Sequence, residues 1–478
     1  MVSAFIVTHK ESLDHKYGAK VVQAQIVPAI QAYADAVKKR GFQAEVALLG
    51  GARNPKNILN TIRQRAKDAY YLVLIGAPDV IPHQELQNPV HGDIDSTIPS
   101  DLPYACDHAP SDSVRDFLHP LRAVGRIPDI SGESTPRALL KALATAAASK
   151  PAKRTVLMPP LALAATEFKD SLGVLVRQAL GSNFPVTTSP GPKLTPALLG
   201  QRLQLLKCHG DDQQPYFSGG NGAGGPIAID AGRIVGGVKA GTIVAAACCY
   251  GASLYDPLGT QTPDASLPIP NAYLLAGAVA FLGCTGIAWV GERGLEGPDI
   301  LLRNYLVALG RGATSGDAHL SALRAFLKSA GSLDAVELKS YAQMTLLGDP
   351  TLQPVESERW MPGHPESGED APSMVDRPEH QRERREEQQR AIVKTLKVAT
   401  KSKVKALPAP VNEALKKLGL HKGAQIETYA HEPVAGPKPP KAERSHLVRA
   451  EHPKQGQRLH VLRERGGALV SHKVLRRG

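Results

Sequence analysis

The segment Thr242-Ile-Val-Ala-Ala-Ala-Cys248-Cys249-Tyr250-Gly251 is an apolar run that ends in two cysteines, a tyrosine and a glycine. A continuous apolar run of this length is typical of a parallel strand that is buried on both faces. Residues 203–208 form a second such run, which leads into His209 and Gly210. The chain between the two runs is long enough for a crossover connection, so we predict that they are neighbouring parallel strands.

A histidine and a cysteine at the ends of neighbouring strands indicate nucleophilic thiol chemistry. Parallel strands end at one edge of their sheet, and the ligands of α/β proteins collect at that edge. The thiolate is the reactive form of cysteine, and a nearby imidazole promotes its formation. We therefore predict His209 as the general base and acid, and Cys248 or Cys249 as the nucleophile. The backbone N–H groups of Gly210 and Cys248 are the predicted donors to an oxyanion.

Two other interpretations of these residues compete with catalysis. Free cysteine is among the most buried residue types, so both thiols could simply fill the core. A zinc site is disfavoured, because adjacent residues of a strand point to opposite faces and the sequence has no Cys-x-x-Cys spacing. We expect no metal site at these residues.

Strand-like and helical segments alternate up to about Pro354, which predicts an α/β fold with a mostly parallel sheet flanked by helices. Residues 84–120 show no clear period and are interpreted as a long loop. The predicted strands are residues 3–7, 44–49, 71–75, 122–124, 155–158, 203–208, 242–247 and 286–290. The predicted helices are residues 19–39, 54–66, 136–148, 167–180, 272–281, 299–309 and 317–330.

The alternation restarts after a break that is rich in Lys and Pro, so we predict two α/β subdomains, residues 1–150 and 151–355. Residues 356–478 differ in composition and are predicted to form a charged linker and a basic C-terminal region. They carry 25 Lys and Arg against 16 Asp and Glu, which accounts for most of the net charge of +12. Within them, residues 432–455 are interpreted as a linker and residues 458–477 as a hairpin.

The cysteine usage and the N-terminus favour a cytoplasmic protein. Five cysteines at irregular spacings are too few for a disulfide framework. The first residues lack the basic and apolar regions of a signal peptide, so a reducing compartment is expected. No apolar run reaches the roughly 18 residues that a membrane span requires.

The order and spacing of these motifs resemble the caspase–hemoglobinase clan of cysteine peptidases, and within it the gingipain-like family. The His-Gly strand followed by the Cys-x-x-Gly strand is similar to the clan as a whole. The resemblance covers residues 1–355 and implies a caspase-like sheet and thiol protease activity. The shorter motifs that are similar to the gingipain-like family are Tyr71–Ile75 with Gly76 and Ile81-Pro82, Ser100-Asp101 with Tyr104, Val124-Gly125-Arg126, Gly277-Ala278 with Phe281-Leu282-Gly283, and the segment 347–352.

The resemblance also implies roles for single residues. It gives His209 the role of general base and acid. A glycine three residues after the nucleophile, common in the clan, selects Cys248, whereas the caspase spacing of two selects Cys249. We prefer Cys248, because it also ends the apolar run. The resemblance implies no required cofactor, and calcium binding in relatives leaves a calcium ion open.

The resemblance also implies a specificity acid early in the helix that follows the strand predicted at residues 155–158. Glu167 and Asp170 occupy that stretch, and either would pair with Arg or Lys at the P1 position of a substrate. The alternative is that both are solvated residues of a first helical turn. The acidic residue that the family carries directly after the strand is not evident, because Pro159-Pro160-Leu161 stand there.

The leading hypothesis is a cysteine endopeptidase that hydrolyses proteins or peptides through an acyl-thioester. The alternative is a catalytically inactive caspase-like binding module whose basic tail binds a polyanion or a partner protein. Residues 391–478 carry 19 Lys and Arg against 6 Asp and Glu, and this positive charge would attract phosphates. Aromatic residues make up only 5% of the chain, which disfavours nucleic acid as a partner but leaves it an open alternative. The tail could equally dock a target protein.

Overall fold

The computed structural model describes residues 2–91, 93–191, 194–220, 225–257, 264–330 and 333–356. Beyond these it describes, mainly as backbone, short segments between residues 400 and 476. The chain divides into two compact units, and the larger one comprises Met1–Asp211 and Pro215–Arg377. Each unit is described by itself below.

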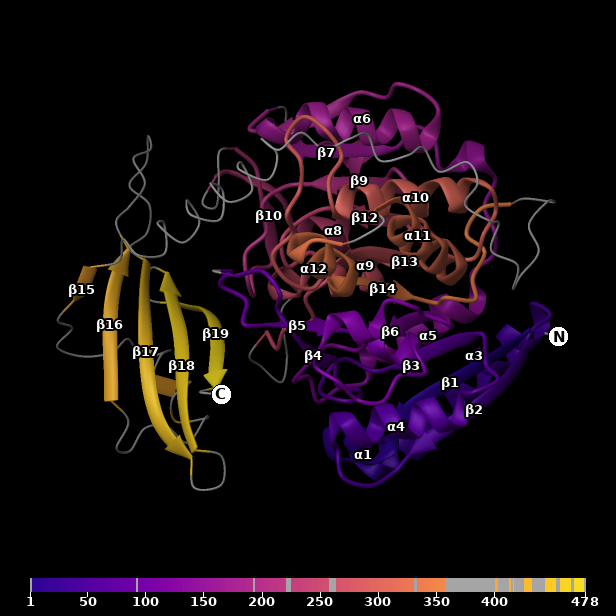
Figure 1. The fold of residues 1–478 in the computed structure, drawn as a ribbon, viewed down its shortest axis with the longest axis horizontal. Coiled ribbons are helices and arrows are strands. Elements are labelled where there is room, and N and C mark those ends of the chain that lie inside the picture. Colours follow the sequence, from indigo (N-terminus) through magenta and orange to yellow (C-terminus); the bar gives the residue numbers. More distant parts are fainter. Residues whose placement is uncertain are drawn as a thin grey trace. The chain divides into compact units, whose positions relative to one another are not determined.

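One ten-stranded sheet runs through the larger unit (Figure 1). Its strand order is β2-β1-β3-β6-β14-β13-β12-β9-β7-β8, and every neighbouring pair is parallel except β13 with β14. This architecture confirms the predicted α/β class with a mostly parallel sheet. The strands are β1 (Ser3–His9), β2 (Gln43–Leu49), β3 (Tyr71–Ile75), β6 (Ala123–Ile127), β7 (Leu161–Ala165), β8 (Val186–Ser189), β9 (Leu203–Lys207), β12 (Ile243–Ala246), β13 (Ala280–Cys284) and β14 (Met344–Gly348).

Helices cover both faces of this sheet (Figure 1). On the half that holds β9 and β12, α6, α10, α11 and α12 pack on one face, which we call the α10 face. Helices α8 and α9 pack on the opposite face, the α9 face. The helices of eight or more residues, with α8, are α1 (Lys10–Tyr17), α3 (Val27–Lys39), α4 (Pro55–Arg65), α5 (Arg137–Ala148), α6 (Lys169–Leu180), α8 (Ala231–Gly237), α9 (Ile269–Ala276), α10 (Pro298–Gly310), α11 (Ser315–Ala330) and α12 (Ala335–Gln343).

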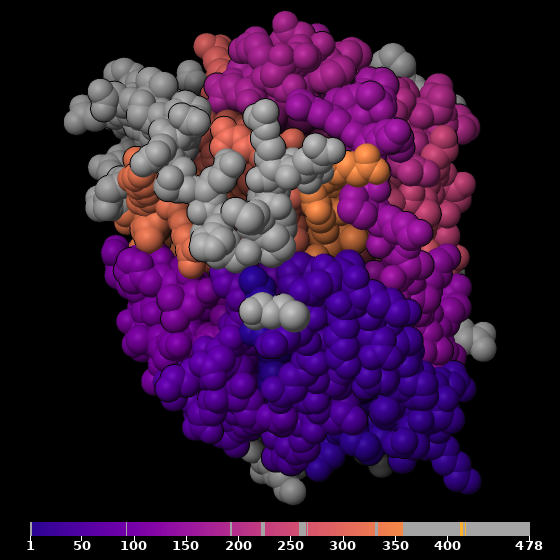
Figure 2. All heavy atoms as spheres, turned by 90° about the vertical axis from the view of Figure 1, so that its right-hand side faces the viewer, coloured from indigo at the N-terminus to yellow at the C-terminus, as the bar shows by residue number. Residues whose placement is uncertain are grey.

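The two halves of the sheet correspond to consecutive parts of the chain. Residues 1–150 supply β1, β2, β3 and β6, and residues 151–355 supply the other six strands. In the space-filling view the first 150 residues, indigo to violet, lie together below the residues that follow (Figure 2). The boundaries of the two predicted subdomains stay a prediction, because the halves share one sheet.

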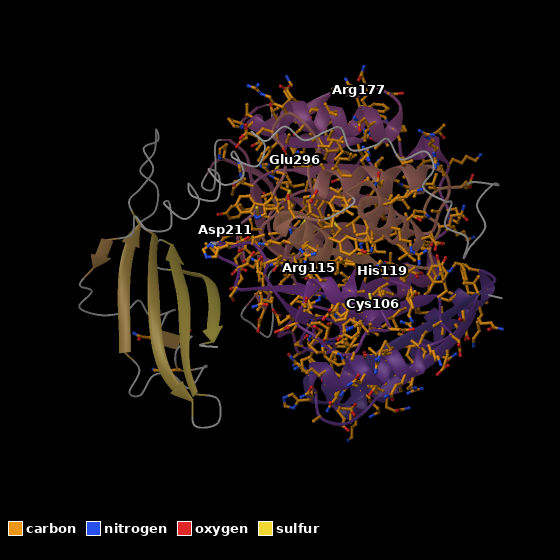
Figure 3. All side chains as sticks on the ribbon, viewed as in Figure 1. Cys106, Arg115, His119, Arg177, Asp211 and Glu296 are labelled. Carbon is orange, nitrogen blue, oxygen red and sulfur yellow. The ribbon has the colours of Figure 1, made fainter. Side chains whose placement is uncertain are left out.

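Local sequence signals fix several helix ends. Asp334 and Glu337 form a capping box at the start of α12. Asn54 caps α4 through the N–H groups of two following residues, and Pro55 occupies the first turn. Gly181, with φ of 71°, ends α6 in the left-handed conformation that favours glycine. Arg177 of that helix lies on the outer surface of the unit (Figure 3).

Two predicted strands are wrong in position. The strand predicted at residues 155–158 is a short turn of 3-10 helix, Arg154–Val156, and the strand β7 begins only at Leu161, after two prolines. Proline cannot donate to a strand ladder, and the Leu-Ala sequence of β7 has the composition of a helix. The strand predicted at residues 286–290 is β13, which lies earlier, at Ala280–Cys284.

Three further differences between the prediction and the structure concern a helix end, an antiparallel pair of strands and a strand of the large sheet. The helix predicted at residues 272–281 ends at Ala276, because Gly277 adopts φ of 99° and closes it. Residues 84–120 are not one loop, since they contain the antiparallel pair β4 (Gln84–Gln87) and β5 (Thr97–Ser100). Strand β14 had no counterpart in the prediction.

The described strands of the smaller unit form a five-stranded antiparallel sheet in the order β15-β16-β17-β18-β19. They are β15 (Thr400–Ser402), β16 (Gln425–His431), β17 (Glu443–His452), β18 (Gly456–Arg465) and β19 (Ala468–Arg476). The pairing of β18 with β19 confirms the predicted hairpin, while β17 occupies much of the predicted linker. Gly466 and Gly467, its predicted turn, lie outside the described residues.

Candidate active site

His209 lies just past the end of β9, beside the short strand β10 (Tyr216–Ser218). Its backbone exchanges two hydrogen bonds with Ser218, at 2.9 and 2.8 Å. Its ring packs against Phe168, with centroids 5.1 Å apart. The side chain of His209 is 22% exposed, so a substrate can reach it. Asp211, two residues further, lies near β10 at the outside of the unit (Figure 3).

The Nε2 atom of His209 contacts two oxygen acceptors. One is Oε1 of Glu167, and the other is the carbonyl oxygen of Gly220, at 3.0 Å. Both atoms only accept hydrogen bonds, which assigns the ring proton to Nε2 and leaves Nδ1 as the basic atom of the neutral ring. The Glu167 carboxylate therefore fixes the tautomer and the orientation of the imidazole.

Glu167 thus occupies a different position from the one expected of a specificity acid. Because β7 ends at Ala165, Glu167 is the acidic residue directly after that strand, which had not been evident from the sequence. The sequence interpretation missed it because it put the strand six residues too early. Asp170, in the first turn of α6, is exposed.

Cys248 lies on the α9 face of the sheet, where it packs among Val244 and Ala246. It is fully buried, at 0% exposure. Its Sγ accepts a hydrogen bond from the N–H of Cys208 at 3.2 Å and lies 3.7 Å from the carbonyl oxygen of Leu206. Burial raises the pKa of the Cys248 thiol well above its ordinary value, so the thiolate is strongly disfavoured there.

Cys249 lies on the α10 face and is partly exposed. Strands β9 and β12 pair with Ile243 opposite Leu203, so six residues further along Cys249 is level with His209. Side chains alternate between the two faces along a strand, and six is an even number of residues. The side chains of His209 and Cys249 therefore lie on the same face as those of Leu203 and Ile243. The two segments also approach closely, because a Cβ atom on Gly210 would lie 1.8 Å from the carbonyl oxygen of Cys249.

The Cys249 sulfur is held by the loop that follows β13. The N–H of Ala288 points at Sγ over 3.4 Å, and Sγ lies 3.6 Å from the carbonyl oxygen of the same residue. Burial raises the pKa of this thiol to about 11. The alternation of side chains was a signal in the sequence that favours Cys249, because with the two runs in register it gives His209 and Cys249 one face.

Backbone donors are present beside this thiol. Among the residues that the structure describes, the N–H groups of Gly210 and Cys249 have no hydrogen-bond acceptor. They are the two N–H groups that could receive an oxyanion if Cys249 attacks a carbonyl. The N–H of Cys248, which the sequence suggested, belongs to the residue that faces the other side.

Within the described ranges, no group of three or more His, Cys, Asp or Glu residues has an arrangement that could hold a metal ion. In the same part of the chain, no helix combines the length and the apolar character needed to cross a bilayer. The calcium ion that the resemblance leaves open stays open.

Three of the short motifs behind the gingipain resemblance meet in a buried hydrogen-bond network. Asp101 accepts from Nε and Nη2 of Arg126, at 2.8 and 2.5 Å, and contacts Nδ1 of His83 at 2.8 Å. Arg126 also donates to the carbonyl oxygens of Gly76 and Ile81, each at 2.7 Å. Burial opposes ionisation of Asp101, but the Arg126 guanidinium and the contact with His83 hold the pKa of its carboxyl below its ordinary value. These motifs therefore hold the fold together.

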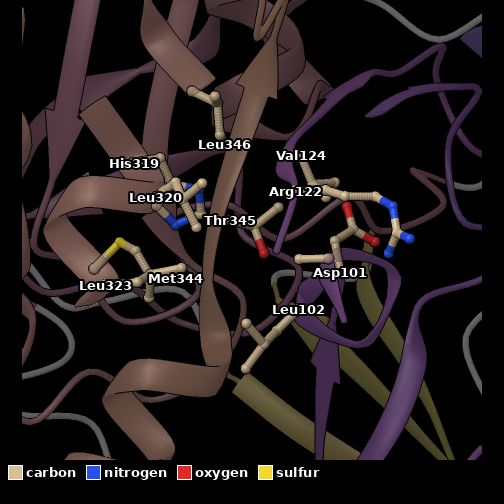
Figure 4. A pocket seen from close by; sticks show the side chains of 11 residues that line it. Asp101, Leu102, Arg122, Val124, His319, Leu320, Leu323, Met344, Thr345 and Leu346 are labelled. Carbon is tan, nitrogen blue, oxygen red and sulfur yellow. The ribbon is translucent and has the colours of Figure 1, made fainter. Parts of the chain in front are cut away.

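A cavity of about 20 Å³ adjoins this network, and Asp101 and His319 are among the residues that line it (Figure 4). Its volume suits about one water molecule. Burial lowers the pKa of His319 to about 4, so this side chain is neutral near pH 7.

Comparison with known proteins identifies the fold. No protein-family model matches the chain, and no curated protein matches it. Among solved structures, the chain is similar to one in the complex of the pro- and mature domains of the gingipain RgpB from Porphyromonas gingivalis. The two chains are 12% identical, the superposition covers 99% of each, and the TM-score is 0.50. At this identity the likeness concerns the fold alone, and we conclude that the larger unit has a caspase-like α/β fold.

Proposed function

We propose that the protein is a cysteine endopeptidase in which Cys249 is the nucleophile and His209 transfers the protons. The observation that carries the proposal is the common register of these residues at the ends of two neighbouring parallel strands, on one face of the sheet. The caspase-like fold is compatible with this activity.

The proposed nucleophile is Cys249, whereas the sequence analysis preferred Cys248. Cys248 is fully buried on the face opposite to His209 and accepts a backbone hydrogen bond. A thiol in that environment neither ionises readily nor reaches a substrate. Cys249 is partly exposed and shares the face of His209, which supports it as the nucleophile.

In the proposed reaction, Nδ1 of His209 takes the proton of the Cys249 thiol, and the thiolate attacks the carbonyl carbon of the peptide bond. The negative oxygen then accepts hydrogen bonds from the N–H groups of Gly210 and Cys249. His209 returns its proton to the leaving amine, and the acyl-thioester remains. Water hydrolyses this ester with His209 again as the base. Glu167 keeps the imidazole in the required tautomer throughout.

A preference for Arg or Lys at P1 is part of the proposal, and it now rests on Asp170. Glu167 is engaged by His209, so it is less suited to a second role as a specificity acid. Asp170 is exposed in the first turn of α6, only three residues beyond Glu167, and is available to a cationic side chain.

A panel of fluorogenic peptides that differ at P1 tests the proposal. Cys249→Ala should abolish cleavage by the folded protein, whereas Cys248→Ala should retain most of it, and Asp170→Asn should reduce the preference for Arg and Lys. The matched pair of alanine variants is its own control, because the two thiols are adjacent in sequence. An active Cys249→Ala variant, or a folded wild type that cleaves no peptide, would contradict the proposal. The second result would favour the inactive binding module.

A further inference from the structure

Three buried charged side chains border the turn that carries Cys249. Nζ of Lys339, on α12, donates to Oδ2 of Asp93 at 2.6 Å and to Oδ2 of Asp95 at 2.8 Å. The exposed fractions of these side chains are 1% for Lys339, 0% for Asp93 and 7% for Asp95. The aspartates come from the segment between β4 and β5, which the sequence pattern had left as loop. A buried ion pair is costly to form, so its place beside a reactive thiol calls for an explanation.

Asp95 joins the two segments that flank the sulfur of Cys249. Its Oδ1 accepts from the hydroxyl of Tyr250 at 2.7 Å, and its Oδ2 accepts from the N–H of Ile287 at 2.8 Å. Tyr250 directly follows Cys249 in the chain, and Ile287 directly precedes Ala288, whose N–H points at Sγ. The Asp95 carboxylate therefore forms hydrogen bonds to both chain segments that flank the Cys249 sulfur.

The turn at Cys249 needs such support. Tyr250 has φ of 52°, in the left-handed region that a bulky L-residue seldom adopts. A conformation of this kind persists only where the surroundings hold it. The N–H of Tyr250 donates to the carbonyl oxygen of Gly286 at 2.8 Å, and its hydroxyl is held by Asp95.

Several titratable groups lie on the elements packed around Cys249. They are Cys248 in its own segment, His209 after β9, Cys284 on β13, Asp93 and Asp95 between β4 and β5, and Lys339 on α12. The positive charge of Lys339 favours the Cys249 thiolate, and the two aspartates oppose it. The neighbouring thiols are buried and neutral, so apart from His209 the charged groups around Cys249 are the three residues of the cluster.

We propose that Asp95 is a positioning residue for Cys249 and that Lys339, held between Asp93 and Asp95, supplies the positive charge that a Cys249 thiolate faces. The importance of these two roles for catalysis rests on the proposed function, in which Cys249 is the nucleophile. Asp93 contacts neither Tyr250 nor Ile287 among the described hydrogen bonds. It accepts from the side chain of Trp289 at 3.3 Å and not from the backbone beside the sulfur, so we assign it to the charge.

The test is the rate at which iodoacetamide alkylates Cys249 between pH 6 and 9, with the modified residue located by mass spectrometry. Alkylation needs the thiolate but no peptidase activity, so the result stands even if the protein cleaves no peptide. Lys339→Met removes a positive charge, which raises the pKa of the thiol and should slow alkylation at pH 8 by about threefold or more. Asp93→Asn removes a negative charge and should accelerate it by a similar factor.

Asp95→Asn and Asp93→Asn form a matched pair, because they change the charge beside Lys339 equally. Positioning by Asp95 predicts that their alkylation rates differ by about threefold or more, and that Asp95→Asn loses more kcat/KM than Asp93→Asn in an active preparation. Lys141→Met, an exposed site on α5, is the surface control for the loss of a lysine. Equal rates for the two asparagine variants would overturn the positioning role. Unchanged profiles in both Lys339→Met and Asp93→Asn would overturn the charge role, and thermal melting checks that each variant is folded.

Discussion

At the scale of single residues, a buried cation supports the region around His209. Lys207 precedes His209 by two residues on the same face, and its Nζ contacts Oδ1 of Asp299 at 2.8 Å and the hydroxyl of Ser171 at 2.8 Å. The same Nζ lies 5.5 Å from the ring centroid of Phe168, the ring on which His209 rests. The imidazole is therefore held by Glu167 at Nε2 and by a ring that is itself anchored by a charged neighbour.

The contact of Glu167 with His209 predicts a loss of activity without a loss of fold. In Glu167→Gln the amide can donate as well as accept, so it no longer fixes the proton on Nε2 of the imidazole. We expect kcat/KM to fall about 10- to 100-fold on any P1 residue. The measurement is peptide cleavage with the P1 panel. Asp170→Asn is the control, and an equal, P1-independent loss in that variant would contradict the separate roles of the two acids.

His319 predicts a stability that depends on pH. Burial holds its pKa at about 4 in the folded state, below the roughly 6.5 of an unfolded histidine. Above pH 6.5 His319 is neutral in both states, so it does not change the free energy of unfolding. As the pH falls, the unfolded state binds the proton first, so stability is lost between about pH 6.5 and 4. We expect wild type to lose about 2 to 3 kcal/mol more than His319→Gln between pH 7 and 4.5, measured by urea denaturation.

The exposed His15 gives the control for this measurement, since His15→Gln should leave the pH dependence as it is. Parallel loss of stability in wild type and in His319→Gln would show that other groups govern the acid limb.

At the scale of elements, the sequence predicted the strands that end at the candidate site better than the strands around them. Residues 203–208 and 242–247 are mostly apolar and are followed by glycine-containing turns, so β9 and β12 were found within a residue or two. Strand β7 was missed because Leu-Ala-Leu-Ala-Ala has no strand signature of its own. Its burial between β8 and β9 decides its conformation, and that is a tertiary effect that local propensity does not carry.

The same limit explains which parts of the site stayed hidden. The sequence could name His209 and the two cysteines, because they terminate strands. It could not reveal Asp95 or Lys339, since these lie in elements far from the thiol in sequence and meet it only through the fold. The contact of Glu167 with His209 was hidden for a different reason. Because the strand before it was predicted six residues too early, Glu167 was not recognised as the acidic residue that follows β7.

Gly125 on β6 lies so close to neighbouring atoms that an added methyl group is expected to destabilise the fold. A Cβ atom on Gly125 would lie 2.8 Å from Cδ of Pro350 and 2.9 Å from the carbonyl oxygen of Gly348, and neither can move freely. We expect Gly125→Ala to lower the free energy of unfolding by about 1 to 3 kcal/mol, as overpacking does in other cores. Denaturation in urea measures the change.

Gly236 in α8 is the matched control for this prediction. A Cβ atom there meets nothing within 4 Å, and the residue is helical. Gly236→Ala should therefore leave stability unchanged or raise it by up to about 1 kcal/mol. Equal destabilisation by the two alanines would argue against the close approach as the cause.

At the scale of the whole molecule, β14 joins the two halves of the large sheet. It pairs in parallel with β6 on one side and antiparallel with β13 on the other. Directly after it, Asp349 accepts hydrogen bonds from Tyr33 and from Arg40, both at 2.7 Å. The segment that follows β14 is thus hydrogen-bonded to α3 and to the residue after it, Arg40, both in the first part of the chain.

This placement of β14 has a consequence for the newly made chain. The strand that connects the halves is the last of the ten to leave the ribosome, and Lys339, which we propose to act on Cys249, emerges only just before it. Contacts between the ends of a long sequence form late in folding, because the intervening loop must first be closed. A nascent chain would therefore carry His209 and Cys249 without the finished scaffold around them until β14 has been made. Under our proposal, the peptidase would reach its working form only once Lys339 and β14 have left the ribosome.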